Sequence, residues 1–176
     1  MDESTFRTSV SSPFCAHASN LSRRPAPRVP QPYLEDILPK KGNVTIAKCK
    51  DRVALICCDG VPLFFQQRDG LIFPTLRTLH KYPNMMPTMR VDKGAISFVM
   101  NGANIMCQGF TSKGGRVDTP LEAGAAVSIL AEGKKTALAV GVTTMSTADI
   151  QTVNKGSAVE NLHYLGDGLF GTKELH

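Results

Sequence analysis

The stretch VDKGAISFVMNGANIMCQGFTS, residues 91–112, decides how the second half of this chain folds. Asp92 is a suitable N-cap for a helix, and apolar residues then recur at the spacing of one helical face, so we expect a short helix that packs against the next segments of the chain. That face comprises Ile96, Val99, Met100 and Ala103. Gly102 is placed to end the helix. Residues 102–115 then carry glycines, hydroxyl groups and a lysine, which indicates flexible backbone rich in hydrogen-bonding groups.

The residues after this stretch predict a small barrel. Two apolar runs at residues 125–132 and 136–145 are typical of buried strands. A capped helix is expected at residues 146–153 and a last strand near residues 158–165. Many short strands with one or two short helices favour a barrel over an open sheet.

The first half predicts a small antiparallel sheet. Strand-like runs occupy residues 44–74, and Asp59-Gly60 and Asp69-Gly70 are suited to its corners. Residues 75–82 have leucines at helical spacing after a proline, which predicts a helix that covers the sheet. A shorter helix is expected at residues 33–38, ahead of a proline that would stop it.

These patterns divide the chain into four parts of an α+β protein. Residues 1–32 are rich in proline and lack any regular period, so we expect them to be mostly disordered. Residues 33–90 form the N-terminal domain, residues 91–172 the second domain and residues 173–176 a tail. A methionine cluster near the boundary is interpreted as packing between the domains rather than as a partner groove. Its members are Met85, Met86 and Met89.

Composition and charge exclude several classes of protein. The 176 residues include no apolar run near the roughly 20 residues that a membrane span needs, and the N-terminus lacks the order of a secretory signal. We therefore expect a cytoplasmic protein without a membrane partner. Residues 1–90 hold 13 Lys+Arg against 7 Asp+Glu, whereas residues 91–176 hold 7 against 8. Any nucleic-acid contact of the second half must therefore use a local patch of cations.

Catalytic and metal-binding patterns are absent from the sequence. The 5 cysteines show no C-x-x-C spacing, and no nucleophile elbow, P-loop or H-E-x-x-H occurs. His80 and His163 stand in apolar company, which is typical of core histidines whose hydrogen bonds are satisfied. We expect no enzyme activity, no metal and no cofactor.

Several long motifs resemble a known family. VDKGAISFVMNGANIMCQGFTS, AEGKKTALAVGVTTMS and NKGSAVENLHYLGDGLF resemble the PUA domain, a compact pseudobarrel found in RNA-modifying enzymes and translation factors. PLFFQQRDGLIFPTLRTLHKYP, ahead of them, resembles the N-terminal (pre-PUA) domain of the malignant T-cell-amplified sequence family. The resemblance covers about residues 34–170, most of the chain.

The resemblance implies a non-enzymatic translation factor that acts on the small ribosomal subunit and its ribosomal RNA. With a density-regulated-protein partner, such a factor helps to place or release tRNA in initiation, reinitiation and recycling. The resemblance assigns partner binding to the N-terminal domain, where we select Phe64 and Phe65 because adjacent strand residues point to opposite sides. It assigns RNA binding to the helix after Asp92, to residues 102–109 and to the last strand.

Our expected RNA-binding residues combine small side chains, which let a phosphate approach the backbone, with hydroxyl donors and cations. They are Lys93, Gly102, Ala103, Asn104, Gly109, Thr111, Lys113, Arg116, Lys134 and Lys135. Two plainer interpretations stay open: a simple helix end at Gly102-Ala103, and a solvated hairpin tip at Lys134-Lys135. Two other functions also stay open, a PUA targeting subunit for an RNA-modifying enzyme and a pure protein–protein adaptor.

Overall fold

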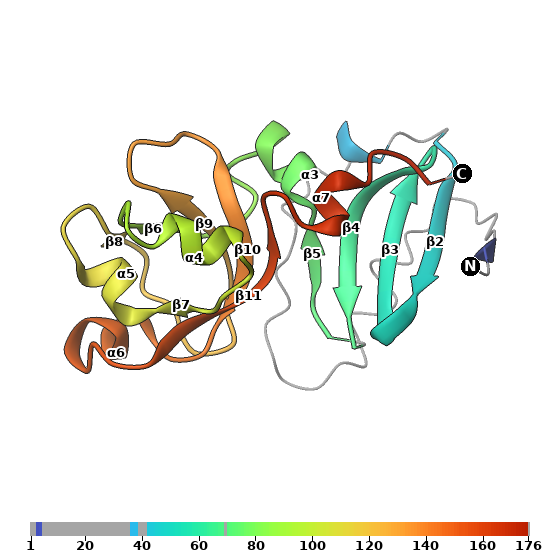
Figure 1. Cartoon of the computed structure of the whole chain (residues 1–176). Coiled ribbons are helices and arrows are strands. Elements are labelled where there is room, and N and C mark those ends of the chain that lie inside the picture. Colours follow the sequence, from blue (N-terminus) through green and yellow to red (C-terminus); the bar gives the residue numbers. More distant parts are fainter. Residues whose placement is uncertain (1–2, 5–35, 39–41, 69, 176) are drawn as a thin grey trace.

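The computed structural model describes residues 3–4, 36–38, 42–68 and 70–175. Two β-sheets lie side by side, with α3 and α7 near their junction (Figure 1). This arrangement confirms the expected α+β class. The helix expected at residues 33–38 and the leader at 1–32 fall mostly outside the described residues, although Asp36 and Ile37 are helical and Ile37 is buried.

The first sheet is antiparallel throughout and has the strand order β1-β2-β3-β4-β5. Its strands are β1 (Glu3–Ser4), β2 (Val44–Cys49), β3 (Val53–Cys58), β4 (Val61–Gln67) and β5 (Ile72–Pro74). A short 3-10 helix, η2 (Lys50–Arg52), joins β2 to β3. The predicted Asp59-Gly60 turn joins β3 to β4, and both residues have the positive φ angles of a tight hairpin, 50° and 80°.

Helix α3 (Leu76–Lys81) follows β5 and confirms the helix predicted at residues 75–82. Its N-cap is Thr75, whose hydroxyl accepts a hydrogen bond from the Thr78 N–H at 3.3 Å. Leu76 and Leu79 are buried, so the apolar face of α3 provides packing rather than solvent contact.

The second sheet has six strands in the order β7-β11-β10-β9-β6-β8. They are β6 (Thr88–Val91), β7 (Ile105–Met106), β8 (Arg116–Val117), β9 (Ala126–Ala131), β10 (Ala137–Thr143) and β11 (Ser157–Tyr164). β6 runs parallel to β9 and all other pairs are antiparallel. A bulge at Val140/Gly141 shifts the register of β10 against β11, which helps this mixed sheet to curl. The domain boundary drawn after residue 90 falls inside β6.

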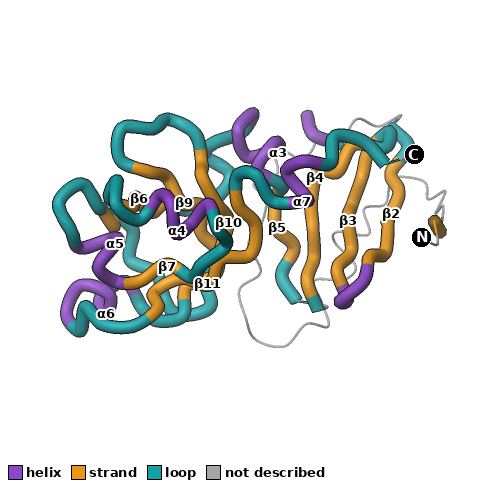
Figure 2. Tube along the Cα trace, in the orientation of Figure 1, coloured by secondary structure: helices purple, strands orange, loops and turns teal. Residues whose placement is uncertain are grey.

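Short helices lie between the strands of the second domain and near the C-terminus (Figure 2). They are α4 (Ile96–Met100), α5 (Cys107–Thr111), α6 (Thr147–Thr152) and α7 (Gly168–Gly171). The predicted helix at residues 146–153 is confirmed as α6, and its N-cap Ser146 accepts from the Asp149 N–H at 3.1 Å. Within the described part of the chain, no helix combines the length and the apolar content needed to cross a bilayer.

The structure corrects the sequence analysis at residues 96–111. α4 is only 5 residues long, and a turn at Gly102 redirects the chain, so the predicted apolar face breaks up. Val99 is buried, whereas Met100 and Ala103 are exposed. Residues 107–111, expected to be flexible backbone, form α5 instead, because Cys107 and Phe110 bury their side chains in the second domain.

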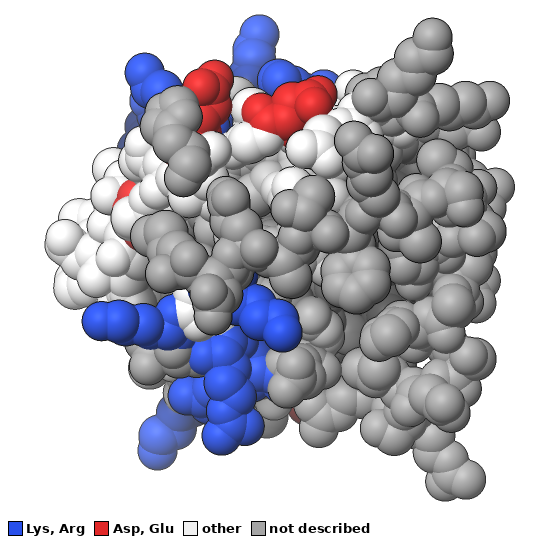
Figure 3. Space-filling model, turned by 90° about the vertical axis from the view of Figure 1, so that its right-hand side faces the viewer, with Lys and Arg blue, Asp and Glu red and all other residues white. Residues whose placement is uncertain are grey.

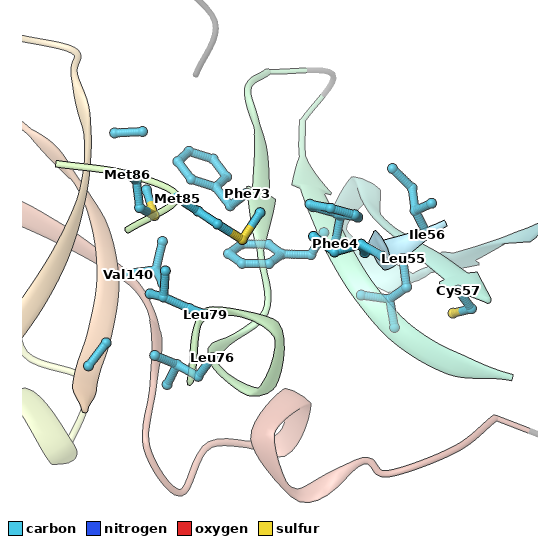
Figure 4. Packing of buried hydrophobic residues seen from close by; sticks show 14 residues of the cluster. Leu55, Ile56, Cys57, Phe64, Phe73, Leu76, Leu79, Met85, Met86 and Val140 are labelled. Carbon is cyan, nitrogen blue, oxygen red and sulfur yellow. The ribbon is translucent and has the colours of Figure 1, made fainter. Parts of the chain in front are cut away.

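One apolar cluster joins the two domains. It combines buried residues of the first sheet and α3 with Val140 on β10. Figure 4 shows Leu79 of α3, Met86 and Val140 meeting at this junction. The expected role of the methionine cluster in packing is confirmed, since Met85 and Met86 belong to this cluster and Met89 to the core of the second domain.

The C-terminal segment returns to the N-terminal domain. The Arg77 guanidinium of α3 donates to the Phe170 carbonyl oxygen from Nη2 at 2.6 Å and lies 4.8 Å from the centre of the Phe170 ring. The Leu175 N–H donates to the Gly60 carbonyl oxygen at 2.8 Å, beside the hairpin turn. Residues 165–175 therefore tie the end of the second domain to the first sheet and α3.

His163 forms the central polar bridge between the domains. It lies on β11 and is 1% exposed. Its Nε2 accepts a hydrogen bond from the Leu76 N–H at 3.1 Å, and its Nδ1 lies 2.7 Å from the Asp167 carboxylate. Because an N–H can only donate, Nε2 carries no proton and Nδ1–H donates to Asp167. The ring also packs edge-on against Phe65, with centroids 5.4 Å apart.

A second histidine crosses the same interface in the opposite direction. The Nε2 atom of His80, on α3, lies 2.8 Å from the Ala137 carbonyl oxygen of β10. Both histidines thus have the structural role that the sequence predicts.

Replacing His163 by alanine should lower the free energy of unfolding by about 1–3 kcal/mol, because the buried Leu76 N–H loses its acceptor. Urea denaturation of the full chain measures this change. His80→Ala is the control and should cost less, since His80 is only half-buried and water can replace it at the Ala137 carbonyl. Equal stability of His163→Ala and the wild-type protein would contradict the assigned bridge.

The pKa of Asp167 produces a pH dependence. Burial by itself raises this pKa, but hydrogen bonds from His163 and from the Phe170 and Tyr164 N–H groups outweigh it and bring the pKa below its ordinary value. The carboxylate therefore stabilises the fold above its ordinary pKa of about 3.9, and this contribution disappears as the pH falls through the lowered pKa.

Asp167→Asn should therefore flatten the acid side of the stability curve. We expect urea unfolding between about pH 5 and pH 3 to show a steeper loss for the wild-type protein than for the variant, which is already less stable at neutral pH. Parallel curves for the two proteins would show that Asp167 contributes no such linkage.

Candidate nucleic-acid interface

An open depression of about 470 Å³ lies on the second domain between α4, β7 and α5. Its lining includes Ala103, Asn104 and Gly109, three of the predicted RNA-binding residues. Lys93 directly follows Asp92 on its wall and is exposed. The structure thus gathers the predicted segment around one concave surface.

Tight turns shape the wall of this depression. The Ala103 N–H donates to the Phe98 carbonyl oxygen at 3.1 Å and the Gly102 N–H to the Val99 carbonyl oxygen at 3.0 Å, a Schellman ending of α4. Gly102 has φ +80°, and an added Cβ would lie 2.9 Å from the Tyr164 ring. At the other end, the Asp92 carboxylate accepts from the Ala95 N–H at 3.1 Å and closes the turn before α4.

Asn161 of β11 ties this wall to the sheet. Its Nδ2 donates to the carbonyl oxygens of Val99 at 3.0 Å and Ala103 at 3.2 Å. Its backbone N–H donates to Oδ1 of Asn104 at 3.1 Å. Asn104 is exposed, and this hydrogen bond from β11 orients its side chain. The last strand, which the resemblance assigns to the RNA face, therefore supports the wall of the depression.

Exposed apolar side chains border the depression, and the sequence analysis does not select them. Phe98 is 66% exposed and Met106 is 48% exposed. Large side chains of this kind usually lie inside a fold, and an exposed aromatic ring beside a concavity can stack on an unpaired base. The signal was present in the sequence, because Phe98 lies off the predicted apolar face of the helix.

The predicted cations form one group and two separate members. Lys113 lies in the loop at residues 112–115, where Gly114 packs against the Glu132 carboxylate at the base of the Lys134-Lys135 hairpin tip. These three lysines are exposed and share one end of the second domain. Lys93 lies apart from these lysines, next to Asp92 of the depression, and Arg116 pairs with the Asp118 carboxylate. The Arg116 charge is therefore partly compensated.

The small and hydroxyl-bearing residues that the sequence analysis assigns to RNA binding have roles within the fold. An added Cβ at Gly109 would lie 3.3 Å from the Ala95 Cβ, and one at Gly114 would run into the Glu132 carboxylate. The Thr111 hydroxyl lies 2.6 Å from Oδ1 of Asn154, to which it donates. Packing of the chain against itself is thus sufficient reason for these residue types.

The two residues selected for partner binding are buried. Phe64 is 0% exposed and Phe65 is 4% exposed. β4 lies between β3 and β5, and both faces of this strand are covered at these positions, so neither side chain is on a surface. Partner contact through the rings of Phe64 and Phe65 is therefore wrong for this structure.

Buried thiols do not form a reactive or metal-binding centre. Burial raises the pKa of Cys107, and burial together with the neighbouring Asp59 carboxylate raises the pKa of Cys58. Both thiols therefore stay protonated at neutral pH. Among the described residues, no group of three or more His, Cys, Asp or Glu side chains could hold a metal ion.

Comparison with known proteins matches both domains. Residues 23–83 match the Pre-PUA-like domain and residues 87–165 the PUA domain. The chain is 51% identical to malignant T-cell-amplified sequence 1 of Rattus norvegicus, over 81% of this chain and 78% of that protein. It is 50% identical to malignant T-cell-amplified sequence 2 of Homo sapiens, over 81% and 78%.

Solved structures agree with the fold. A hypothetical protein of Pyrococcus horikoshii OT3 has 25% identity and a TM-score of 0.66, over 81% of this chain and 86% of that chain. A PUA domain protein of Aeropyrum pernix K1, solved as a tartrate complex, has 28% identity and a TM-score of 0.60, over 74% of each chain. The matches confirm the pre-PUA domain followed by a PUA domain and support an RNA-binding role.

Phe98→Ala should weaken the binding of a short single-stranded RNA by about 5- to 150-fold, the range expected for one lost stacking contact of about 1–3 kcal/mol. Fluorescence anisotropy with a labelled oligonucleotide measures the change. Val153→Ala is the matched control, because Val153 is also an exposed apolar residue but does not line the depression. Equal RNA affinities of the two variants would show that the depression is not the RNA site.

Proposed function

Since the chain belongs to the malignant T-cell-amplified sequence family, we propose that it is a non-enzymatic RNA-binding translation factor that acts on the small ribosomal subunit in the cytoplasm. The observation that carries this proposal is the depression on the second domain, with an exposed Phe98 at its border and Lys93 beside it. A site of this kind can hold an unpaired nucleotide without transforming it. It suits a factor that positions RNA.

The chemistry of the depression favours single-stranded over double-helical RNA. Phe98 provides a ring for stacking, and the Asn104 amide provides a donor for a base edge or a ribose oxygen. Lys93 can neutralise a phosphate of the same nucleotide. Unpaired bases occur at the ends and loops of structured RNA, so the end of a tRNA or a loop of ribosomal RNA fits this site.

We further propose that a density-regulated-protein partner binds the N-terminal domain and that the pair acts in initiation, reinitiation and recycling. The shared apolar cluster and the His163 bridge support a positional mechanism. A partner bound to the N-terminal domain then keeps the depression at a fixed position on the ribosomal subunit, so that tRNA can be accepted or released. Surface residues other than Phe64 and Phe65 make this contact.

A pure protein–protein adaptor is the second candidate. Phe98, Met100 and Met106 are all exposed near the depression, and an apolar surface of this kind also suits a protein partner. An adaptor of this type would not depend on the lysines at the end of the second domain, which makes the two functions separable.

The Lys113/Lys134/Lys135→Ala variant should dissociate from small ribosomal subunits at lower salt than the wild-type protein. If three phosphate contacts are lost, the slope of log affinity against log salt should shrink by roughly 2 to 3. Gradient sedimentation of tagged full-length protein in cell lysate, with co-purifying proteins identified, measures the association.

Lys81/Lys173→Ala is the control, since it removes two lysine charges from exposed positions away from the depression and from the three lysines. Equal behaviour of both variants would favour the adaptor. Co-sedimentation with an RNA-modifying enzyme in place of the ribosome would favour a targeting subunit, and either result would contradict the proposed translation role.

A further inference from the structure

Four exposed cations meet at one end of the first sheet, far from the depression. We call them the basic corner: Lys48, Lys50, Arg52 and Arg68. Figure 3 shows a group of Lys and Arg side chains at the lower edge of this face of the molecule, whereas at the upper edge Lys and Arg side chains lie among Asp and Glu side chains. The charge surplus of the first half of the sequence is thus partly concentrated in one place.

The strand register explains why these residues converge. Lys48 is on β2, Lys50 and Arg52 are in η2 between β2 and β3, and Arg68 directly follows β4. The Arg68 N–H donates to the Arg52 carbonyl oxygen at 2.8 Å, so these two residues are neighbours. Adjacent strands lie about 4.8 Å apart, and the corner is therefore about 10 Å wide.

The backbone at the two arginines is unfavourable for their residue type. Arg52 has φ 56° and Arg68 has φ 51°, in the left-handed region that glycine or asparagine adopts more easily. Non-glycine residues in this region tend to occur at functional sites, where the side chain is kept despite the backbone cost. Two arginines in this conformation, joined by one hydrogen bond, indicate that their side chains are needed here.

The positive charge of the corner is not neutralised within the described structure. The ion pairs found among the described residues involve Arg116 and His163, neither of which is at the corner. Two acidic residues, Asp51 and Asp69, adjoin the four cations in the sequence and are outnumbered by them. The corner therefore keeps a local surplus that can attract an anionic ligand.

We propose that the basic corner is a second RNA contact, which binds the phosphate backbone of a double-helical RNA segment. Among the described residues, the strongly exposed aromatic ring is that of Phe98, which lies on the other domain. The described part of the corner therefore offers no exposed ring on which an unpaired base could stack. A duplex carries roughly one negative charge per 1.7 Å of its axis, so a corner about 10 Å wide spans several phosphates. Binding is independent of sequence, because phosphates are the groups contacted.

The corner and the depression then act as two sites on one rigid body. The shared apolar cluster and the hydrogen bonds of His163 and His80 hold the two domains together. Figure 1 shows the β2–β3 end of the first sheet and the α4–α5 region at opposite ends of the molecule. A duplex at the corner and a single strand at the depression are thereby kept at a fixed separation.

Arg52→Gly/Arg68→Gly is the informative variant, because glycine relieves the positive φ angles and keeps the fold while both charges are lost. Anisotropy of the full chain with a labelled RNA duplex of about 20 base pairs should show weaker binding, and the salt slope should shrink by roughly 2. Lys81→Gln/Lys173→Gln removes the same charge from exposed positions away from the corner and should bind as the wild-type protein does.

Wild-type duplex affinity and salt slope in the arginine variant would overturn the proposal. Displacement of the duplex by polyglutamate at equal charge concentration would also overturn it, since the corner would then be a site for acidic protein. Phe98→Ala should leave duplex binding unchanged. A negative result for the corner therefore does not contradict the single-strand site of the proposed function, and a negative result for that site does not contradict the corner.

Discussion

The rest of this structure depends on the hydrogen bonds of one neutral imidazole, which is buried where the two domains meet. His163 accepts from the first N–H of α3 and donates to Asp167, which in turn caps α7. A buried polar group without a hydrogen-bond partner costs about 1–3 kcal/mol of stability. Removing any one of these three groups therefore leaves another without its partner. The apolar cluster around them supplies most of the burial, but it is nondirectional. The hydrogen bonds of the imidazole are directional, and they fix the position of α3 relative to β11.

This rigid junction gives the proposed function its physical meaning. A factor that positions RNA must convert contacts at one place into a defined geometry at another, and a flexible linker between domains cannot do so. Here the C-terminal segment crosses back to the first sheet, and Arg77 holds the Phe170 carbonyl oxygen at 2.6 Å. Two domains of modest size thereby behave as one body, in which the depression and the basic corner keep their separation.

Local signals in the sequence predicted the structure correctly. The Asp59-Gly60 hairpin, α3 after Pro74 and α6 with its Ser146 cap all occur as predicted, because turn and cap chemistry depends on a few adjacent residues. The predictions were wrong where packing decided the outcome. α5 forms because Cys107 and Phe110 pack into a core made by distant strands. Phe64 and Phe65 are both buried although they were selected for partner binding.

Taken alone, the amino-acid sequence determined the α+β class, the two-domain order and most strands, since hydrophobic period and turn residues encode these locally. The segment at the face that holds the depression was selected through the family resemblance. Only the tertiary structure decided which side chains reach that face and why. It brought out Phe98 and Met106, gave the glycines internal packing reasons and assembled the basic corner from β2, η2 and the end of β4. Pairing between strands that are far apart in the chain sets these positions, and no local pattern contains that information.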